Sequence, residues 1–357
     1  MTLVVEVTLD RKIPIYLTGE IVVVEVRVHN EGKARERLAW GSVQLTSDRT
    51  FGRRKVLEGH TGTSISHSAS NVFSSLPSVI FCDLDVAPSH SKTFTCQIIL
   101  PVDGLPPSFK GHYLRYTNRI TVGVARIRST VRMLHVSLRV MQSVGLDCKQ
   151  PSVAADPFLP VMASLPTVSQ LVTSTVDVIT APRKPSLFSL TNSQGKIASL
   201  TLYKKAFRLG EDVIGHVSFH DSSLRTIHMH CVVETVESLS DEVVTSDAQP
   251  FIQLQGTDDR FCASLQDCHF RIAIPMTASP SFHTQTVHYK WRLRFEFSIV
   301  DDIGLELNEE DATLLLSPLD ITRERLSWST DILVLPCTPY NAALTEEHLV
   351  SHSVLSL

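Results

Sequence analysis

Apolar and polar residues alternate with a period of two near the N-terminus. Val22, Val24, Val26 and Val28 are separated by Val23, Glu25, Arg27 and His29. This period places the four even-numbered valines on one face of a β-strand, so it predicts a strand with one buried side. Just before it, Leu17–Glu20 predicts a turn in which Gly19 takes a positive φ.

Short apolar or alternating runs predict further strands along most of the chain. They cover 1–12, 38–45, 79–86, 93–100, 114–124, 131–140, 197–203, 213–219, 227–236, 268–274, 287–299 and 332–335. Trp40 is the expected core anchor of its strand, and 47–75 is expected to be a long loop or a hairpin. Short strands at this spacing predict an all-β fold built of β-sandwiches.

The clearest alternation lies in the strand predicted at 287–299. Its inward positions are expected to be Tyr289, Trp291, Leu293, Phe295 and Phe297, and its outward positions His288, Lys290, Arg292, Arg294 and Glu296. This pattern predicts a half-buried strand with an aromatic inner face.

The chain also contains an internal repeat. The segments 16–30 and 207–221 align without a gap, and Gly210 minus Gly19 gives their offset of 191. A second block, Pro280-Ser281-Phe282 with Tyr289, matches Pro107-Ser108-Phe109 with Tyr116 at an offset of 173, since 280 minus 107 is 173. Two copies of so long a unit predict two similar domains.

The predicted domains are 1–146 and 197–337, joined by a linker at 147–196 rich in Pro, Ser and Thr and followed by a polar tail at 338–357. Residues 301–311 are expected to form an acidic loop. In the linker, six apolar residues recur at roughly helical spacing: Leu165, Val168, Leu171, Val172, Val176 and Ile179. Two interpretations stay open, a partly disordered connector and a short amphipathic helix packed on a domain or a partner.

Composition narrows the class of protein. With 357 residues, 43% of them hydrophobic, the chain can form two cores. A formal net charge of −4 argues against nucleic acid as a partner. The seven cysteines lack regular spacing and indicate reduced thiols of a cytosolic protein. The first residues lack a basic stretch, so we expect no signal peptide, and 157–176 is too polar for a membrane span.

Candidate catalytic motifs fail when examined. Gly195-Lys196 is typical of a phosphate loop, but Leu190 stands where the second glycine is needed. The best metal candidates are His228, His230, Cys231, Cys262, Cys268 and His269. On a strand, His228 and His230 share a face from which Cys231 points away, so we expect ordinary strand side chains and core thiols.

Two further groups of charged residues need an interpretation. Glu20 and Glu211 each follow a turn glycine in a separate domain, so we expect them to lie far apart and in solvent, not to form a catalytic pair. Basic residues recur on the expected outer faces of strands: Arg126, Arg128, Arg132, Arg139, Lys290, Arg292 and Arg294. They are interpreted as solvated faces, with docking of an acidic partner or anionic lipid as the alternative. We therefore expect no catalytic, cofactor-binding or metal-binding residues.

Several blocks resemble a known family. The aromatic-x-x-Gly-Glu-x-Val pattern resembles the opening of arrestin-fold domains, which occur as two tandem immunoglobulin-type sandwiches. Four longer blocks, 79–94, 105–123, 207–215 and 287–297, resemble the RGP (reduced-growth-phenotype) family, and 38–45 fits it as well. Members of that family are arrestin-like partner subunits of a two-protein guanine nucleotide exchange factor. The loop at 47–75, the linker, the acidic loop and the tail fall outside the resemblance.

The resemblance implies a function without covalent chemistry. The chain would act with a large propeller-containing subunit of the RIC family on a Golgi Rab GTPase of the Rab-six class, in endosome-to-Golgi and intra-Golgi transport. It would be cytoplasmic and peripheral on the Golgi membrane, with no cofactor and no enzymatic activity of its own. No catalytic residue carries over from the family.

Two other functions stay open. One is an arrestin-domain trafficking adaptor that binds cargo or recruits a ubiquitin ligase. Such adaptors carry PPxY motifs, whereas the nearest string here, Pro106–Phe109, ends in Phe and falls inside a predicted domain. The other is a β-sandwich enzyme or metal-binding protein, which the failed motifs disfavour.

Overall fold

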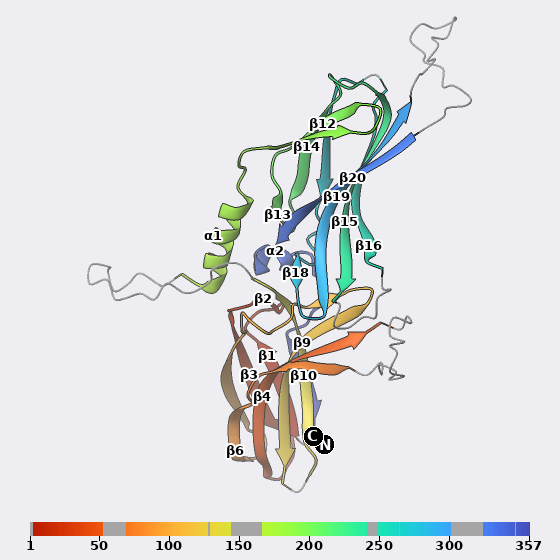
Figure 1. Cartoon of the computed structure of the whole chain (residues 1–357). Helices are drawn as coiled ribbons and strands as arrows, with labels where there is room; N and C mark the ends of the chain where they lie inside the picture. Colours follow the sequence, from red (N-terminus) through yellow and green to blue (C-terminus); the bar gives the residue numbers. More distant parts are fainter. Residues whose placement is uncertain are drawn as a thin grey trace, which may run out of the picture.

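A computed structural model describes residues 3–52, 69–127, 129–143, 166–240, 249–263, 265–300, 324–346 and 348–357. Strands dominate the described residues, with two helices among them (Figure 1). The strands form two units stacked end to end, and both chain termini lie at the far end of the first unit. The prediction of an all-β fold is confirmed.

Two sheets make up the first sandwich. One has the order β21 (His352–Ser356), β1 (Leu3–Leu9), β3 (Ile21–Asn30) and β7 (Ser91–Ile99). The other has the order β2 (Ile15–Leu17), β10 (Arg132–Met141), β9 (Leu114–Arg126), β4 (Glu36–Phe51) and β5 (Ser70–Ser74), with β6 (Ser78–Val86) on β4 and β8 (Phe109–Lys110) on β9. Val22, Val24, Val26 and Val28 are fully buried against Val43, Leu45, Ile120 and Val122 of the facing sheet. The period-of-two prediction for β3 is therefore confirmed.

The second sandwich has a similar arrangement. One sheet has the order β11 (Ser186–Thr191), β12 (Lys196–Leu202), β14 (Asp212–Ser218) and β17 (Asp267–Ala273). The other has the order β13 (Ala206–Arg208), β20 (Glu324–Leu335), β19 (Val287–Val300), β15 (Arg225–Leu239) and β16 (Phe251–Phe261), with β18 (Phe282–His283) on β19. The inward residues predicted for β19 are all buried, and four of the five are fully buried.

The repeat seen in the sequence has the same structure in both copies. β2 pairs in parallel with β10, as β13 does with β20. The turns after β2 and β13 place Gly19 at φ 92° and Gly210 at φ 85°, so the predicted positive φ at Gly19 is confirmed. A side chain is disfavoured in this region, which explains a glycine in each copy. The likeness of the two sandwiches to the arrestin fold stays a prediction.

The segment between the sandwiches contains helix α1 (Val168–Thr180). Thr167 caps it, accepting a hydrogen bond from the Gln170 N–H while the Gln170 side chain accepts one from the Thr167 N–H. Val172 and Val176 are buried one turn apart. The helix interpretation is thus confirmed, and residues 147–165 of the predicted linker lie outside the described residues. The linker's last part forms strand β11, because the edge of β12 offers it a pairing partner.

The polar tail also differs from its prediction. It forms α2 (Pro339–Ala343) and strand β21, which pairs with β1 of the first sandwich. Leu355 and Leu357 pack against the core of that sandwich. Strand β1 begins the chain and β21 ends it, so the pairing of the tail with β1 is visible only in the tertiary structure.

The prediction for Trp40 is wrong, since this side chain is 36% exposed. The pairing register of β4 shifts between Leu38 and Trp40 and again between Gly41 and Ser42. Gly41 consequently faces the core, where the Phe81 ring occupies the space a side chain would need. In 47–75, the hairpin alternative fits better than a loop, because β4 continues to Phe51 and β5 returns beside it. Residues 53–68 and the predicted acidic loop at 301–311 lie outside the described residues.

Candidate functional site

The second block of the repeat forms the junction between the two sandwiches. Phe109 pairs with Tyr116 across β8 and β9, and Phe282 pairs with Tyr289 across β18 and β19. The Phe109 ring centroid lies 4.9 Å from both Phe282 and Tyr289, in edge-to-face contacts. The two copies of the motif therefore meet in one aromatic cluster, in which each sandwich supplies a Phe and a Tyr.

The serine of the same block holds each copy in place. The Ser108 hydroxyl accepts a hydrogen bond from the Val140 N–H at 3.0 Å, and the Ser281 hydroxyl accepts one from the Val334 N–H at 3.1 Å. Each bond ties the segment before the phenylalanine to the neighbouring strand, β10 or β20. The repeated Pro-Ser-Phe sequence thus positions the ring that crosses the junction.

Glu237 of β15 makes a buried polar contact across the junction, with 3% of the residue exposed. Its carboxylate accepts hydrogen bonds from the backbone N–H groups of His112 at 2.6 Å and Tyr113 at 2.9 Å. The His112 ring also stacks on Phe251 at 3.8 Å. A buried carboxylate is costly without partners, so these two bonds bind the β8–β9 turn tightly to the second sandwich.

Arg139 forms a second polar contact across the junction. It donates to Glu346 at 2.9 Å and to the carbonyl oxygens of Met276, Thr277 and Ala278 at 3.1–3.4 Å. Only 12% of its side chain is exposed. The guanidinium therefore joins β10 to a loop of the second sandwich and to the segment after α2.

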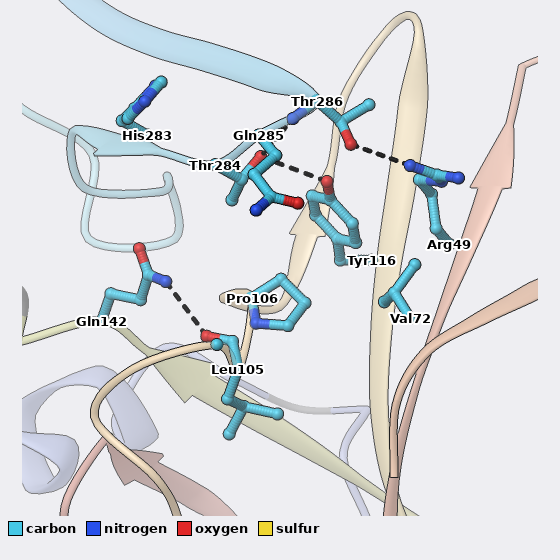
Figure 2. Close-up of a pocket in the computed structure, with 11 residues that line it drawn as sticks. Arg49, Val72, Leu105, Pro106, Tyr116, Gln142, His283, Thr284, Gln285 and Thr286 are labelled. Carbon is cyan, nitrogen blue, oxygen red and sulfur yellow. Dashed lines mark hydrogen bonds between the residues drawn. The ribbon is translucent and has the colours of Figure 1, made fainter. Parts of the chain in front are cut away.

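A pocket of about 470 Å³ opens beside the aromatic cluster (Figure 2). The first sandwich contributes Arg49, Tyr116 and Gln142, and the second contributes 283–286. Arg49 donates to the Thr286 hydroxyl at 2.8 Å, and the Tyr116 and Thr284 hydroxyls lie 3.2 Å apart. The Arg49 Nε and Gln142 Oε1 atoms are buried without a hydrogen-bond partner among the described residues. Since both sandwiches line the pocket, its shape depends on how they are oriented.

Glu20 and Glu211 are bound by different partners, and the expectation that they lie in solvent is wrong. Glu20 is 6% exposed, accepts from the Leu17 N–H at 2.7 Å and pairs with Arg11 at 2.7 Å. Glu211 accepts from the Arg208 N–H at 3.0 Å and pairs with Lys204 at 2.7 Å. Burial alone would raise the pKa of Glu211, but the hydrogen bonds from Lys204 and Arg208 outweigh it and lower that pKa. Both carboxylates close the turn behind the repeated glycine, which is a structural role.

The metal candidates are divided between surface and core. His228 and His230 lie on one face of β15, both near the Asp259 carboxylate, while Cys231 is fully buried. Burial raises the pKa of Cys262 to about 12, which keeps the thiol protonated. His269 contacts the His216 ring instead. Among the residues that the structure describes, no three His, Cys, Asp or Glu side chains are placed to hold a metal ion, and the six described cysteines are free thiols.

The predicted basic faces fall into three groups. Arg292 and Arg294 pair with Glu234, which is 2% exposed, and Arg126 pairs with Glu36. Arg132 and Lys290 are exposed, whereas Arg139 lies in the junction. Arg128 lies outside the described residues.

Sequence reasoning missed Glu237 and Arg49. Each is one charged residue within a strand, and no local pattern distinguishes it from a solvated side chain. The only signal for the junction was the second block of the repeat, which identified Phe109, Phe282 and their tyrosine partners. The Pro106–Phe109 string lies in the same junction with Phe109 5% exposed, so a peptide-binding domain could not reach that ring in this structure.

None of the described helices is both long enough and apolar enough to cross a membrane.

Comparison with known proteins gives a consistent result. The family model described as Rgp1 matches residues 9–158 and 161–300, which covers parts of both sandwiches. A human protein named RAB6A-GEF complex partner protein 2 is 27% identical over 364 residues, covering 91% of this chain and 93% of its own length. The cattle protein of the same name is 26% identical over 361 residues, covering 89% of this chain and 90% of its own.

Proposed function

Because this chain belongs to the Rgp1 family, we propose that it is a subunit of a complex that exchanges guanine nucleotide on a Rab GTPase. The observation that carries the proposal is the match of both sandwiches to relatives named as partners in a RAB6A exchange complex. The match covers nine-tenths of each chain, so it concerns the whole two-sandwich body.

We further propose that the subunit contributes binding surfaces and no covalent chemistry. Nucleotide exchange breaks no covalent bond, since the factor only has to bind the nucleotide-free GTPase more tightly than the nucleotide-bound form. Glu20 and Glu211, the carboxylates with the most suggestive sequence context, are engaged in closing turns. The large partner is proposed to be a propeller-containing subunit of the RIC family, and the site of action the cytoplasmic face of the Golgi, in retrograde transport.

The contacts across the junction support this role. A subunit that presents surfaces on two domains must hold those domains at a fixed angle, or binding would cost additional ordering entropy. The aromatic cluster, the Glu237 bonds and the Arg139 contacts all restrict that angle. One continuous body can therefore contact the large subunit and the GTPase together.

The test is reconstitution. The chain is co-expressed with the large subunit, and release of a fluorescent guanine nucleotide is measured from a Golgi Rab of the Rab-six class. We expect a stable two-protein complex that accelerates release well beyond either protein alone, while a Rab of another compartment serves as the control. A chain that stays monomeric beside the large subunit, or a pair that leaves release at the intrinsic rate, would contradict the proposal.

A further inference from the structure

A second groove, of about 490 Å³, lies between the sandwiches and is lined by the Phe109, Tyr116 and Tyr289 rings of the junction. Strands β8, β9 and β10 line it from the first sandwich, and β16 and the 277–279 loop from the second. Its volume falls within the range of about 300–1,000 Å³ typical of ligand sites, which often occur between domains.

The groove carries an excess of positive charge. Three cations line it, Lys110, Arg115 and Arg139, against a single carboxylate, Glu346. That carboxylate is already paired with Arg139 at 2.9 Å. Lys110 and Arg115 are both exposed, and no ion pair joins either of them to a carboxylate among the described residues.

Lys110 and Arg115 also stand directly opposite each other in the pairing of β8 with β9. Like charges at opposed positions destabilise a pair of strands, so this arrangement is unfavourable for folding by itself. An anion seated between the two side chains would remove the repulsion and use both charges. The same groove presents the hydroxyl groups of Thr277 and Ser279 and the amide of Gln253.

We propose that this groove binds an acidic segment of a partner protein, with its carboxylates between Lys110 and Arg115. A peptide fits better than a membrane, because residues of both sandwiches line the groove, and an extended chain can contact β8–β10 and β16 at once. Hydroxyl and amide side chains can donate to and accept from a peptide backbone, so Thr277, Ser279 and Gln253 can bind the chain on which the carboxylates are carried. The site is independent of which complex the chain joins.

The experiment uses the full chain and a fluorescein-labelled peptide of six glutamates, with a peptide of six glutamines as the neutral probe. Fluorescence anisotropy gives Kd for the chain and for the double variant K110Q/R115Q. We expect binding of the glutamate peptide only, and a Kd about tenfold or more higher for the double variant, since each cation near an anionic ligand contributes substantially. The charge-preserving variant K110R/R115K should keep most of the affinity.

A matched control is R183Q/K184Q, which removes two exposed cations at a distant site before β11. We expect this control to bind like the unchanged chain. The melting temperature of K110Q/R115Q should stay the same or rise, because the repulsion across β8 and β9 is gone, which separates a lost ligand contact from a damaged fold.

Three results would overturn the proposal. The first is no binding of the glutamate peptide, and the second is an equal loss of affinity for that peptide in R183Q/K184Q. The third comes from sedimentation with phosphatidylserine vesicles: K110Q/R115Q binds the vesicles less than the unchanged chain does but binds the glutamate peptide equally well. The last result would assign Lys110 and Arg115 to lipid headgroups instead.

Discussion

Replacing Glu237 with Ala tests how the two sandwiches are held together. The carboxylate accepts two backbone N–H bonds from the β8–β9 turn, and it is 3% exposed. A hydrogen bond to a charged group contributes about 1.5–3 kcal/mol, so two of them contribute about 3–6 kcal/mol before the cost of burying the charge. After the substitution, water can partly reach the half-buried turn and bind its N–H groups. We therefore expect the free energy that docks the turn onto the second sandwich to fall by about 3 kcal/mol.

A loss of about 3 kcal/mol changes the equilibrium between the docked and undocked turn by roughly a hundredfold. Amide hydrogen exchange measures this directly. The N–H groups of His112 and Tyr113 should exchange about a hundred times faster in E237A, while amides in the centre of β9 keep their protection. E237Q should fall between, because its amide oxygen preserves one bond and its NH₂ group faces the other donor.

Glu234 provides the control on the same strand. It is as buried as Glu237 but pairs with Arg292 and Arg294 inside the second sandwich. E234A should therefore destabilise that sandwich without changing exchange at His112 and Tyr113. If these two amides stay protected in a folded E237A protein, the role assigned to Glu237 is refuted.

Three further predictions follow from the same contacts. F109A removes the ring that contacts Phe282 and Tyr289, and should lower the free energy of unfolding by about 3 kcal/mol. Chemical unfolding should then split into two transitions, one for each sandwich, and a single unchanged transition would contradict this. Ending the chain at Ser351 removes β21 and two partly buried leucines, and should lower the stability of the first sandwich by about 2 kcal/mol in urea titrations, leaving the second unaffected. Glu211 has a lowered pKa, so its stabilising effect is full above the pKa of an unfolded Glu, about 4.3, and is lost as pH falls through the folded value. E211Q should therefore be less stable than the unchanged chain at pH 7, and should lose less further stability than that chain when the pH falls to 3. If the free energy of unfolding of the two proteins follows parallel curves against pH, the assignment is refuted.

The sequence predicted the local structure well where a strand has one buried face. The alternation in β3 and β19 follows from the two-residue period of a strand, and the buried valines and aromatic residues are those that it predicts. The repeated glycine at the turns was also predictable, since few other residues accept a positive φ. The exposure of Trp40 was not predictable, because a register shift between Leu38 and Trp40 in β4 reverses its direction, and such a shift leaves no mark in composition.

The sequence by itself determined that this protein consists of two related all-β units, and its motifs identified the family. Only the tertiary structure decided what joins them. Glu237 finds its donors about 125 positions away, and β21 pairs with the first strand of the chain. Contacts of this kind depend on the final orientation of two folded bodies, while sequence periodicity reports only how each strand faces its own core. Lys110 and Arg115 illustrate the same limit, since two separate charges in the sequence become one opposed pair only when β8 folds onto β9.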